Sequence, residues 1–371
     1  MNILIIGGGV AAFEAALAAA TCENCKVTLC SGEAVPPYRR PALSRMVAEE
    51  LSESAFYFKQ SSFYQERNID LRLSKTAVSI NRDKQLVTFA DGEVLPYDKL
   101  ILATGSCAFI PPLPGAKEYA CALRDYNDLQ FFRNQLAAGV DCAVVVGGGV
   151  LGLELVDSLL AKGCKVTLVE SGSSVLARNL DPETGAKVTE QLKKLPNLTI
   201  KTNAKVCEVT KDSVILEDET LSSSLTVFST GVRSCSALAA DAGLEVSPAG
   251  IVVNERMESS DKNIYSCGDA AAPPAGGFKL LSAAKAMGQT AGTNAAGGNM
   301  VYTPESCPVR MMALGLKIFS AGKLEDAACE VTDDGNGNCQ RLVRDAQGNL
   351  TGVILTGDLK AAVKLQKELV F

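Results

Sequence analysis

Two apolar runs that each end in three glycines are the clearest pattern along the chain. Residues 4–10 read Leu-Ile-Ile-Gly-Gly-Gly-Val, and residues 144–150 read Val-Val-Val-Gly-Gly-Gly-Val. Each run is followed by an apolar, helix-like segment and then by the same tetrapeptide, Lys-Val-Thr-Leu, at residues 26–29 and 165–168. A strand, a glycine turn, a helix and a second strand make a βαβ unit. The repeat therefore predicts two βαβ units, and with them two dinucleotide sites.

The segments around these units predict further strands. Residues 76–80 and 86–89 alternate between apolar and polar positions across a turn, as antiparallel strands do. Residues 100–105 and 225–231 each read as a buried strand that stops at a glycine. A proline-rich stretch at residues 111–115 marks a linker between two domains.

The last part of the chain predicts one packed helix and a separate small piece. Residues 276–298 are rich in Ala and Gly, as a tightly packed helix would be, and Pro304 and Pro308 mark a boundary after them. The remaining residues read as strands around turns and end in a helix from about Lys360.

These boundaries predict an α/β fold with two Rossmann-like dinucleotide-binding domains and a small α+β C-terminal domain. The first domain is discontinuous and takes residues 1–108 and 229–300. The second spans residues 109–228, and the C-terminal domain spans residues 301–371.

Composition fits a multidomain globular protein. The chain has 371 residues, of which 47% are hydrophobic and 21% charged, so it has enough apolar surface for a sizeable core. The net charge of −6 is modest and no long basic run occurs. We therefore expect neither nucleic acid nor a membrane as a partner.

The N-terminal residues and the cysteines indicate a cytoplasmic protein with reduced thiols. Met1 and Asn2 lead directly into apolar residues 3–6, without the cationic segment and small-residue cleavage site of a secretory signal. No uncharged apolar stretch reaches the length of about 18 residues that a membrane helix needs. The thirteen cysteines are odd in number and scattered, in a chain large enough to fold without disulfides.

The first glycine motif, Gly7-x-Gly9-x-x-Ala12, follows a strand and opens an Ala-rich helix. In a dinucleotide site the first glycine turns the chain, the second admits the pyrophosphate, and the small third residue packs the helix on the sheet. The carboxylate expected at the end of the next strand is displaced, with Ser31 at the aligned place and Glu33 two residues later. Glu33 is therefore a candidate ribose ligand, with a solvated loop charge as the alternative.

The second motif, Gly147-x-Gly149-x-x-Gly152, is complete, and Glu170 follows at the end of the next strand. A carboxylate there accepts hydrogen bonds from the ribose hydroxyls of the adenosine and repels a 2′-phosphate. Ser171 comes next rather than an arginine. These residues favour NADH over NADPH.

Six motifs follow one another in the order of residues 7–9, 37–44, 103–105, 147–154, 230–233 and 264–269. This order resembles the FAD-dependent pyridine nucleotide-disulfide oxidoreductases, whose fold is of the glutathione-reductase type. The Tyr-x-Arg-Pro-x-Leu-Ser element at residues 38–44 is similar to that of the NADH:rubredoxin and ferredoxin reductase branch. The resemblance covers roughly residues 1–300 and is specific as an ordered set.

The resemblance implies that the first domain holds FAD and the second NAD, with an aspartate at the start of a helix hydrogen-bonded to the ribityl chain of FAD. The residues assigned to FAD are Gly7, Gly9, Ala12, Glu33, Arg40, Ala77, Thr104, Gly105, Arg124, Gly268 and Asp269. Those assigned to NAD are Gly147, Gly149, Gly152, Glu170 and Gly231. For Asp269 a plain helix cap is the alternative role.

Arg45 and Glu154 are the candidate catalytic residues. In similar reductases an acid at the position of Glu154 pairs with a lysine that closes the Leu-Ser-Lys motif, and this chain has Arg45 there. The resemblance implies an Arg45–Glu154 ion pair that positions the nicotinamide and stabilises a flavin anion, although arginine cannot donate a proton as lysine can. An inert buried pair is the alternative. The chain also contains no Trp, which similar reductases place in the helix near residue 287.

The missing residues argue against a thiol relay. Residues 36–50 contain no cysteine to take electrons from the flavin, and the chain has no histidine, the usual general acid and the commonest metal ligand. Cys22-x-x-Cys25 has redox spacing but falls at the end of the first helix, away from the phosphate loop. We expect no metal site.

The sequence therefore predicts hydride transfer from NADH to FAD, followed by release of single electrons to a small carrier of the rubredoxin or ferredoxin class. An acidic carrier needs a basic patch, for which Arg39, Arg45, Lys279 and Lys285 are candidates, although Arg39 is otherwise expected to be a plain surface charge. The alternatives are an NADH oxidase or peroxidase and a sensing flavoprotein similar to apoptosis-inducing factor. A homodimer through the C-terminal domain also stays open.

Overall fold

The computed structural model of the protein describes residues 1–276, 279–304, 308–324, 328–334 and 337–370. They fall into two compact units. Unit 1 comprises Met1–Ala42, Leu51–Cys107 and Val232–Glu305, and unit 2 comprises Leu43–Glu50, Ala108–Gly231 and Ser306–Phe371. This division differs from the predicted one, because residues 43–50 belong to unit 2 and the C-terminal residues share that unit.

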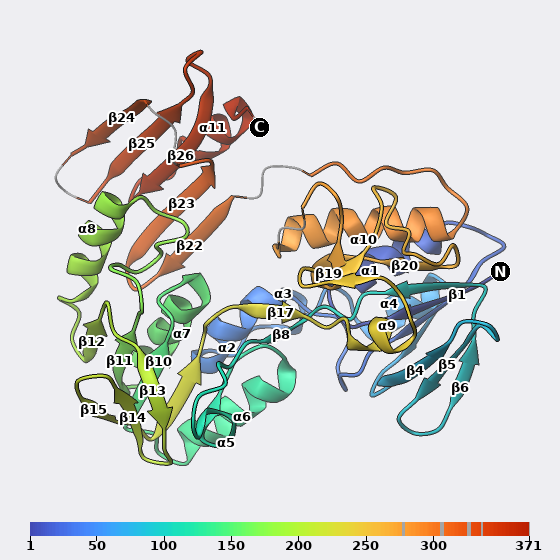
Figure 1. The fold of residues 1–371 in the computed structure, drawn as a ribbon, viewed down its shortest axis with the longest axis horizontal. Helices are drawn as coiled ribbons and strands as arrows, with labels where there is room; N and C mark the ends of the chain where they lie inside the picture. The colour runs from blue at the N-terminus through green and yellow to red at the C-terminus, as the bar shows by residue number, and fades with distance from the viewer. Residues whose placement is uncertain (277–278, 305–307, 325–327, 335–336, 371) are drawn as a thin grey trace. The chain divides into compact units, whose positions relative to one another are not determined.

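Unit 1 is built on a parallel sheet of five strands in the order β20-β7-β1-β2-β3. Figure 1 labels β1 and β20 of this sheet. The chain leaves β1 for β2 and β3 on one side and places β7 and β20 on the other, so the strand order reverses between β1 and β7. Ligands of such sheets bind at the carboxyl ends of the strands where the order reverses. The strands are β1 Asn2–Ile6, β2 Lys26–Cys30, β3 Ile69–Arg72, β7 Lys99–Leu102 and β20 Ile264–Ser266.

Helices α1 (Val10–Ala19) and α10 (Leu281–Ala295) pack on this sheet and on each other. A Cβ at Gly288 or Gly292 would overlap the backbone of α1, so these two glycines permit a very close approach. The prediction of a tightly packed Ala- and Gly-rich helix is confirmed for Leu281–Ala295, whereas the described residues 276, 279, 280 and 296–298 lie outside the helix. Residues 277 and 278 of that stretch lie outside the described residues.

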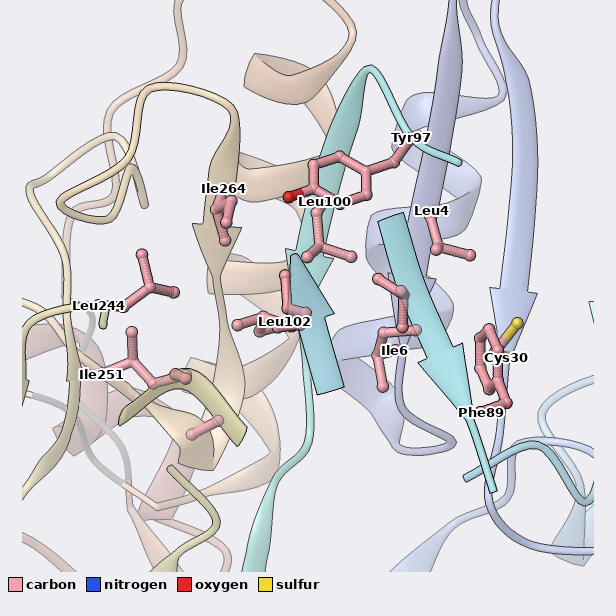
Figure 2. Close-up of a cluster of buried hydrophobic side chains, with 14 residues drawn as sticks. Leu4, Ile6, Cys30, Phe89, Tyr97, Leu100, Leu102, Leu244, Ile251 and Ile264 are labelled. Carbon is pink, nitrogen blue, oxygen red and sulfur yellow. The ribbon is translucent and has the colours of Figure 1, made fainter. Parts of the chain in front are cut away.

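Alternate residues of the strands form a buried cluster on one face of the sheet (Figure 2). Leu4 and Ile6 of β1 meet Leu100 and Leu102 of β7, because side chains two apart on a strand point to the same face. The antiparallel sheet β4-β5-β6 contributes Phe89 to the same cluster. This arrangement confirms the predicted antiparallel strands and the buried strand of residues 100–105.

The other elements of unit 1 are short. Strands β8 and β17 pair with each other, and β18, β19 and β21 form a small sheet. Their bounds are α3 Glu53–Phe56, α4 Ser61–Glu66, β4 Ala77–Asn81, β5 Leu86–Phe89, β6 Val94–Pro96, β8 Ser106–Ala108, β17 Val232–Ser234, α9 Ala237–Asp241, β18 Val246–Ser247, β19 Gly250–Val252 and β21 Ala271–Ala272, with 3-10 turns η1 Arg40–Ala42 and η2 Gly268–Ala270.

Unit 2 repeats the design with a five-stranded parallel sheet in the order β12-β11-β10-β16-β9. Its order reverses between β10 and β16, which corresponds to the reversal between β1 and β7. The strands are β9 Ala120–Cys121, β10 Cys142–Val146, β11 Lys165–Val169, β12 Leu198–Lys201 and β16 Leu225–Phe228, and a three-stranded sheet comprises β13 Val206–Val209, β14 Ser213–Leu216 and β15 Thr220–Ser222.

The helices of this repeat begin in two different ways. Asp125 caps α6 (Tyr126–Ala137) in a capping box with Asp128, and Asp181 caps α8 (Pro182–Leu192) with Pro182 in the first turn. In contrast, no side chain of the described part of the chain caps α7 (Val150–Ala161), nor α1 in unit 1. The other helices are α2 Leu43–Ala48 and α5 Ala116–Tyr119.

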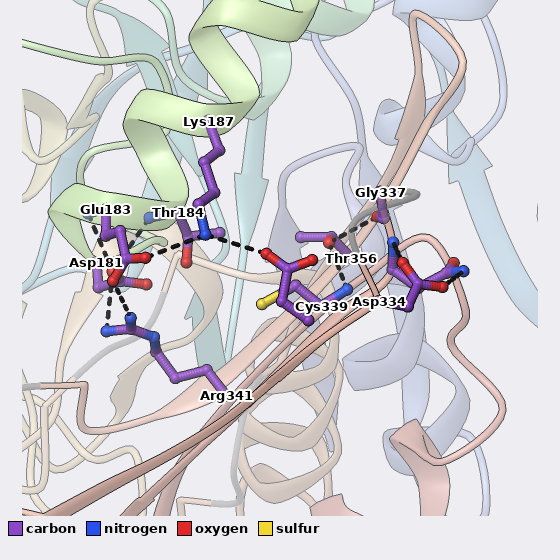
Figure 3. Close-up of polar contacts among 11 residues, drawn as sticks. Asp181, Glu183, Thr184, Lys187, Asp334, Gly337, Cys339, Arg341 and Thr356 are labelled. Carbon is purple, nitrogen blue, oxygen red and sulfur yellow. Dashed lines mark hydrogen bonds and ion pairs between the residues drawn. The ribbon is translucent and has the colours of Figure 1, made fainter.

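The C-terminal part of unit 2 is an antiparallel sheet in the order β22-β23-β26-β25-β24 with one helix packed on it. An alternating row of charges joins this sheet to α8: Arg341 contacts Asp181 and Glu183, and Lys187 contacts Glu183 and Asp333 (Figure 3). The elements are β22 Val309–Ala313, β23 Leu316–Gly322, β24 Ala328–Asp333, β25 Cys339–Arg344, β26 Leu350–Thr356 and α11 Ala362–Glu368.

Candidate functional site

The motifs assigned to FAD within unit 1 gather at one edge of its sheet. Gly7 follows β1, Glu33 follows β2, Thr104 and Gly105 follow β7, and Gly268 follows β20. Because the sheet is parallel, all four strands end at the same edge. The structure thus brings together residues from positions as far apart as 7 and 268.

The glycine loop of unit 1 has the shape that a pyrophosphate requires. Gly7 has a positive φ of 147°, and a Cβ there would overlap the carbonyl oxygen of Ala103. At Gly9 the only described atom within 4 Å of a Cβ would be Nε of Arg40, at 3.9 Å. Ala12 is fully buried. The first turn of the uncapped helix α1 therefore keeps backbone N–H groups for an anion.

Glu33 lies beside this loop and forms an ion pair with Arg40. Its Oε1 is 2.6 Å from Nη2 of Arg40, and its Oε2 accepts a hydrogen bond of 2.6 Å from the hydroxyl of Tyr38. Its backbone N–H donates to Oγ of Ser31, the residue at the aligned place. Glu33 and Arg40, both assigned to FAD, thus form one ion pair.

Each unit anchors its Thr-Gly strand end in the same way. In unit 1 the hydroxyl of Thr104 donates to the carbonyl of Cys235 at 2.7 Å, and the carbonyl of Gly105 accepts from the N–H of the same residue at 2.9 Å. In unit 2 the hydroxyl of Thr230 and the carbonyl of Gly231 bond Phe109 in the same two ways, at 2.5 and 2.9 Å. The sequence analysis did not predict Cys235 and Phe109 as partners, and the repeated Thr-Gly pair was the one signal in the sequence that pointed to them.

Asp269 lies in a 3-10 turn of three residues rather than at the start of a long helix, because α10 begins at Leu281. Its Oδ2 accepts a hydrogen bond of 2.6 Å from Oγ of Ser106. Gly268 has a φ of 69°, and a Cβ there would come within 2.7 Å of Cβ of Ala11. The carboxylate is thereby held close to the helix that carries the first glycine loop.

Two other residues assigned to FAD do not follow any of the four strands β1, β2, β7 and β20. Ala77 is the first residue of β4 and packs against the buried cluster. Arg124 belongs to unit 2, where its backbone N–H donates to Oδ2 of Asp128 at 2.7 Å just before α6. For both residues the contact with FAD stays a prediction.

The glycine loop of unit 2 leaves no room for a side chain at its first and third glycines. A Cβ at Gly147 would overlap the carbonyl oxygen of Ser229, and a Cβ at Gly152 would overlap that of Gly147. At Gly149, by contrast, no described atom lies within 4 Å of where a Cβ would be. The loop is therefore held against the end of β16 at its first glycine and against the start of α7 at its third, and it stays open above its second.

Glu170 also lies beside its loop, but only hydrogen-bond donors surround it. Its Oε2 accepts from the N–H of Gly148 at 2.7 Å, and its Oε1 accepts from the N–H of Gly172 at 2.7 Å and from Oγ of Ser171 at 3.2 Å. No cation of the described chain lies within ion-pair distance of it. The carboxylate is positioned by backbone N–H groups and one hydroxyl.

The expected ion pair between Arg45 and Glu154 is wrong. Arg45 instead contacts Glu49, one turn further along α2, with 2.9 Å between Nη2 and Oε2, and both side chains are more than half exposed. Glu154 accepts a hydrogen bond of 2.9 Å from Oγ of Ser44. Because Arg45 projects from the helix toward solvent, its neighbour Ser44 takes the place that the prediction gave to the cation.

Glu154 is half-buried on α7, and burial raises its pKa above the usual range of a carboxyl group. The hydrogen bond from Ser44 opposes this shift, and the negative charge of Asp157 adds to it. Helix α2 is fastened beside it, because Oγ of Ser158 donates to the carbonyl of Ser44 at 2.7 Å and Arg133 donates to carbonyls near the end of α2.

The four candidates for a basic patch are largely engaged within the protein. The guanidinium of Arg39 is not a plain surface charge: it donates to three carbonyls near the end of α3 and lies over the ring of Phe58. Lys285 lies 3.2 Å from the buried carboxylate of Glu14, and Lys279 donates to Ser234. With Arg45 paired to Glu49, these contacts reduce the charge available to an acidic carrier.

The cysteines show no disulfide among the twelve that the structure describes. Cys22 and Cys25 lie in a turn after α1, and burial, then a hydrogen bond with Cys22, raises the pKa of Cys25 to about 11. Burial also raises the pKa of Cys267 to about 12. Raised pKa values disfavour thiolates, so these thiols suit packing rather than redox chemistry.

Every helix in the described ranges is too short or too polar to cross a membrane.

These observations define the class of protein: an α/β fold with two equivalent glycine loops, one in each unit, of the kind that binds dinucleotides. The family model for pyridine nucleotide-disulphide oxidoreductases matches residues 1–288. The chain belongs to this family.

Three known proteins illustrate the branch. The chain is 32% identical over 327 residues to the NADH-rubredoxin oxidoreductase of Clostridium acetobutylicum, which covers 88% of this chain and 82% of that protein. It is 35% identical over 280 residues to a rubredoxin-NAD(+) reductase of Pseudomonas putida, covering 73% and 72%. Among solved structures, the covalent putidaredoxin reductase–putidaredoxin complex matches with a TM-score of 0.86 at 26% identity, over 99% of this chain and 91% of that one.

The family, the fold class and the oxidoreductase class predicted from the sequence are confirmed. FAD and NADH, the predicted cofactors, are the cofactors of this family. The roles of individual residues stay predictions.

Proposed function

We propose that the protein is an NADH oxidoreductase that holds FAD in unit 1 and NADH in unit 2 and passes electrons to a small redox protein of the rubredoxin or ferredoxin class. One observation carries the proposal: two equivalent glycine loops, each open above its second glycine, each opening an uncapped helix and each flanked by a carboxylate. When bound, FAD supplies the chemistry, because it accepts two electrons as a hydride and gives them up singly.

In unit 1 the loop of Gly7 and Gly9 would take the pyrophosphate of FAD on the N–H groups of α1. Glu33 would accept hydrogen bonds from ribose hydroxyls while Arg40 balances its charge. Asp269, held by Ser106, would accept from hydroxyls of the ribityl chain. Together these side chains anchor the cofactor at both ends.

In unit 2 the loop of Gly147 and Gly149 would take the pyrophosphate of NADH, and Glu170 would bind its ribose. The carboxylate repels a 2′-phosphate, so NADH is the expected donor. Glu154 offers a hydrogen-bond acceptor one turn beyond the loop, and the Gly231 strand end adjoins the same sheet edge. We retain the three-domain division as the functional one, with residues 301–371 as the C-terminal domain.

Residues 36–50 contain no cysteine, which argues against a thiol relay of the glutathione-reductase type. Transfer from the cofactor directly to a docked carrier needs none, and relatives are named for rubredoxin and putidaredoxin. We further propose that the protein works in the cytoplasm, where the absence of disulfides among the described cysteines is the usual condition.

The test is an anaerobic titration of the purified protein with NADH, followed at the flavin band near roughly 450 nm. We expect bleaching by NADH, little bleaching by NADPH, and rapid return of the band when rubredoxin or ferredoxin is added. Reoxidation by oxygen or peroxide alone would favour the NADH oxidase alternative. A stable reduced complex that no acceptor discharges would favour a sensor.

A further inference from the structure

The carboxylate of Glu154 depends on a hydroxyl where a cation was expected. Its Oε2 accepts from Oγ of Ser44 at 2.9 Å, and no described lysine or arginine lies within 4 Å of it. A hydroxyl stabilises a carboxylate less than a cation does, so this acid keeps its proton to a higher pH than a lysine-paired acid would.

The arginines on α2, α6 and β22, the elements near Glu154, are each engaged with other groups. On α2, Arg45 and Glu49 pair with each other near the surface. On α6, Arg133 donates to the carbonyls of Met46 and Glu49. On β22, which packs against α7, Arg310 lies over the ring of Phe319. On α7 itself, Asp157 adds a negative charge.

Ser44 is held firmly enough to direct this carboxylate. It is buried, with 5% of its surface exposed, and its carbonyl accepts the hydroxyl of Ser158 at 2.7 Å. The two serines therefore clamp the first turn of α2 to successive turns of α7. This clamp keeps the Ser44 hydroxyl within reach of Glu154.

We propose that Ser44 is a positioning residue that keeps Glu154 ionised and oriented toward bound NADH, so that reduction by NADH falls away at acid pH as Glu154 takes up a proton. The proposal rests on the function proposed above. Ionised Glu154 accepts hydrogen bonds, for example from the carboxamide N–H of a nicotinamide. Protonated Glu154 has one oxygen that donates instead, and so it loses part of this acceptor capacity.

The experiment measures the rate constant of anaerobic flavin reduction by NADH in the FAD-loaded protein, from about pH 5 to pH 9, at low and at saturating NADH. The wild type should show an acid limb in the rate at low NADH. Ser44→Ala removes the hydrogen bond to the ionised form and should move this limb upward by about one pH unit. Glu154→Gln should abolish the limb, and Ser44→Thr, which keeps a hydroxyl, should restore its wild-type position.

Ser158→Ala is the matched control, because it removes a buried hydroxyl from the same clamp without touching Glu154. We expect a lower melting temperature and a limb that moves less than in Ser44→Ala, because the Ser44 hydroxyl itself remains. An acid limb that stays in place in Ser44→Ala, or that survives in Glu154→Gln, would overturn the inference while the proposed function stands. A wild-type flavin that NADH does not reduce at any pH would instead overturn the proposed function.

Discussion

The glycine loops of the two units have a similar backbone, but the carboxylates beside them have different partners. In both loops a Cβ at the first glycine would overlap the end of a neighbouring strand, whereas a Cβ at the second glycine would meet no described atom closer than 3.9 Å. Glu33 of unit 1 is already paired with Arg40, whereas Glu170 of unit 2 is bonded only to N–H groups and a hydroxyl among the described residues.

With the ligands proposed above, FAD in unit 1 and NADH in unit 2, this difference fits one site that retains its ligand and another that exchanges it. Arg40 and Tyr38 hold Glu33 in place before any ligand arrives, so binding there needs little rearrangement. Glu170 can exchange its backbone hydrogen bonds for those of a ribose at each turnover. An uncompensated carboxylate also discriminates strongly against a phosphate on that ribose.

The largest effect should follow from filling the open space above the second glycine. Gly149→Val places a side chain where no described atom lies within 4 Å, so the fold should tolerate it. The lost pyrophosphate contacts, about 3 kcal/mol, should raise the KM for NADH by about 100-fold with FAD content unchanged.

The matched variant in unit 1 is Gly9→Val, which should be purified with little FAD and should still bind NADH. Bound flavin is measured by absorbance and NADH binding by fluorescence. If both variants lost the same ligand, the assignment of one dinucleotide to each unit would be wrong.

The next effect concerns stability at the third position of each motif. Gly152→Ala would drive a methyl group into the carbonyl oxygen of Gly147, and we expect a cost of about 2 kcal/mol and a melting temperature lower by about 5 °C. The reciprocal change, Ala12→Gly, should cost about 1 kcal/mol through helix propensity. Equal losses in thermal unfolding experiments would contradict the tighter packing inferred for unit 2.

Removal of the carboxylates should affect ligand binding unequally. Glu170→Ala loses a charge-assisted hydrogen bond worth about 1.5–3 kcal/mol, so the KM for NADH should rise about tenfold or more and the preference over NADPH should shrink. Glu33→Ala should leave NADH kinetics alone and loosen FAD, since it removes the carboxylate that pairs with Arg40. An unchanged NADH preference in the Glu170 variant would reject the ribose assignment.

The smallest effect is a pH dependence of stability. Burial raises the pKa of Glu154, so the folded protein binds this proton more tightly than the unfolded chain does. Stability from this group is then present at acid pH and lost as the pH rises from the unfolded toward the folded pKa. Glu154→Gln should therefore melt at the same temperature as wild type near pH 4, and slightly higher at pH 7. Differential scanning fluorimetry at both pH values measures this, and a variant less stable at pH 7 would contradict it.

Much of the fold was readable from the sequence because its signals are local. The apolar runs before Gly7 and Gly147, the turns and the Ala-rich helix predicted the strands, loops and α10. The glycines in these motifs are sterically required, so their presence implies the loop. The placement of Glu170 follows from the same logic, since a residue at the end of β11 must lie beside the loop at the end of β10.

The parts that failed depend on how helices pack. Ser44 and Glu154 are 110 residues apart, and which of two neighbours, Ser44 or Arg45, points toward α7 is decided by the rotation of a six-residue helix. The charge of Arg39 was likewise misread, because its carbonyl partners lie in a later segment of the chain. No periodicity in the sequence encodes such choices.

Asp181 has two roles where α8 meets the C-terminal sheet. Its Oδ1 accepts the first N–H groups of α8 and also lies 3.0 Å from Arg341, while its side chain is 7% exposed. The sheet is therefore not a freely exchangeable module. Any replacement of the C-terminal sheet that lacked a cation at the position of Arg341 would leave the buried carboxylate of Asp181 without its counter-ion and weaken the start of α8. Recombination at this boundary must therefore carry Asp181 and Arg341 together.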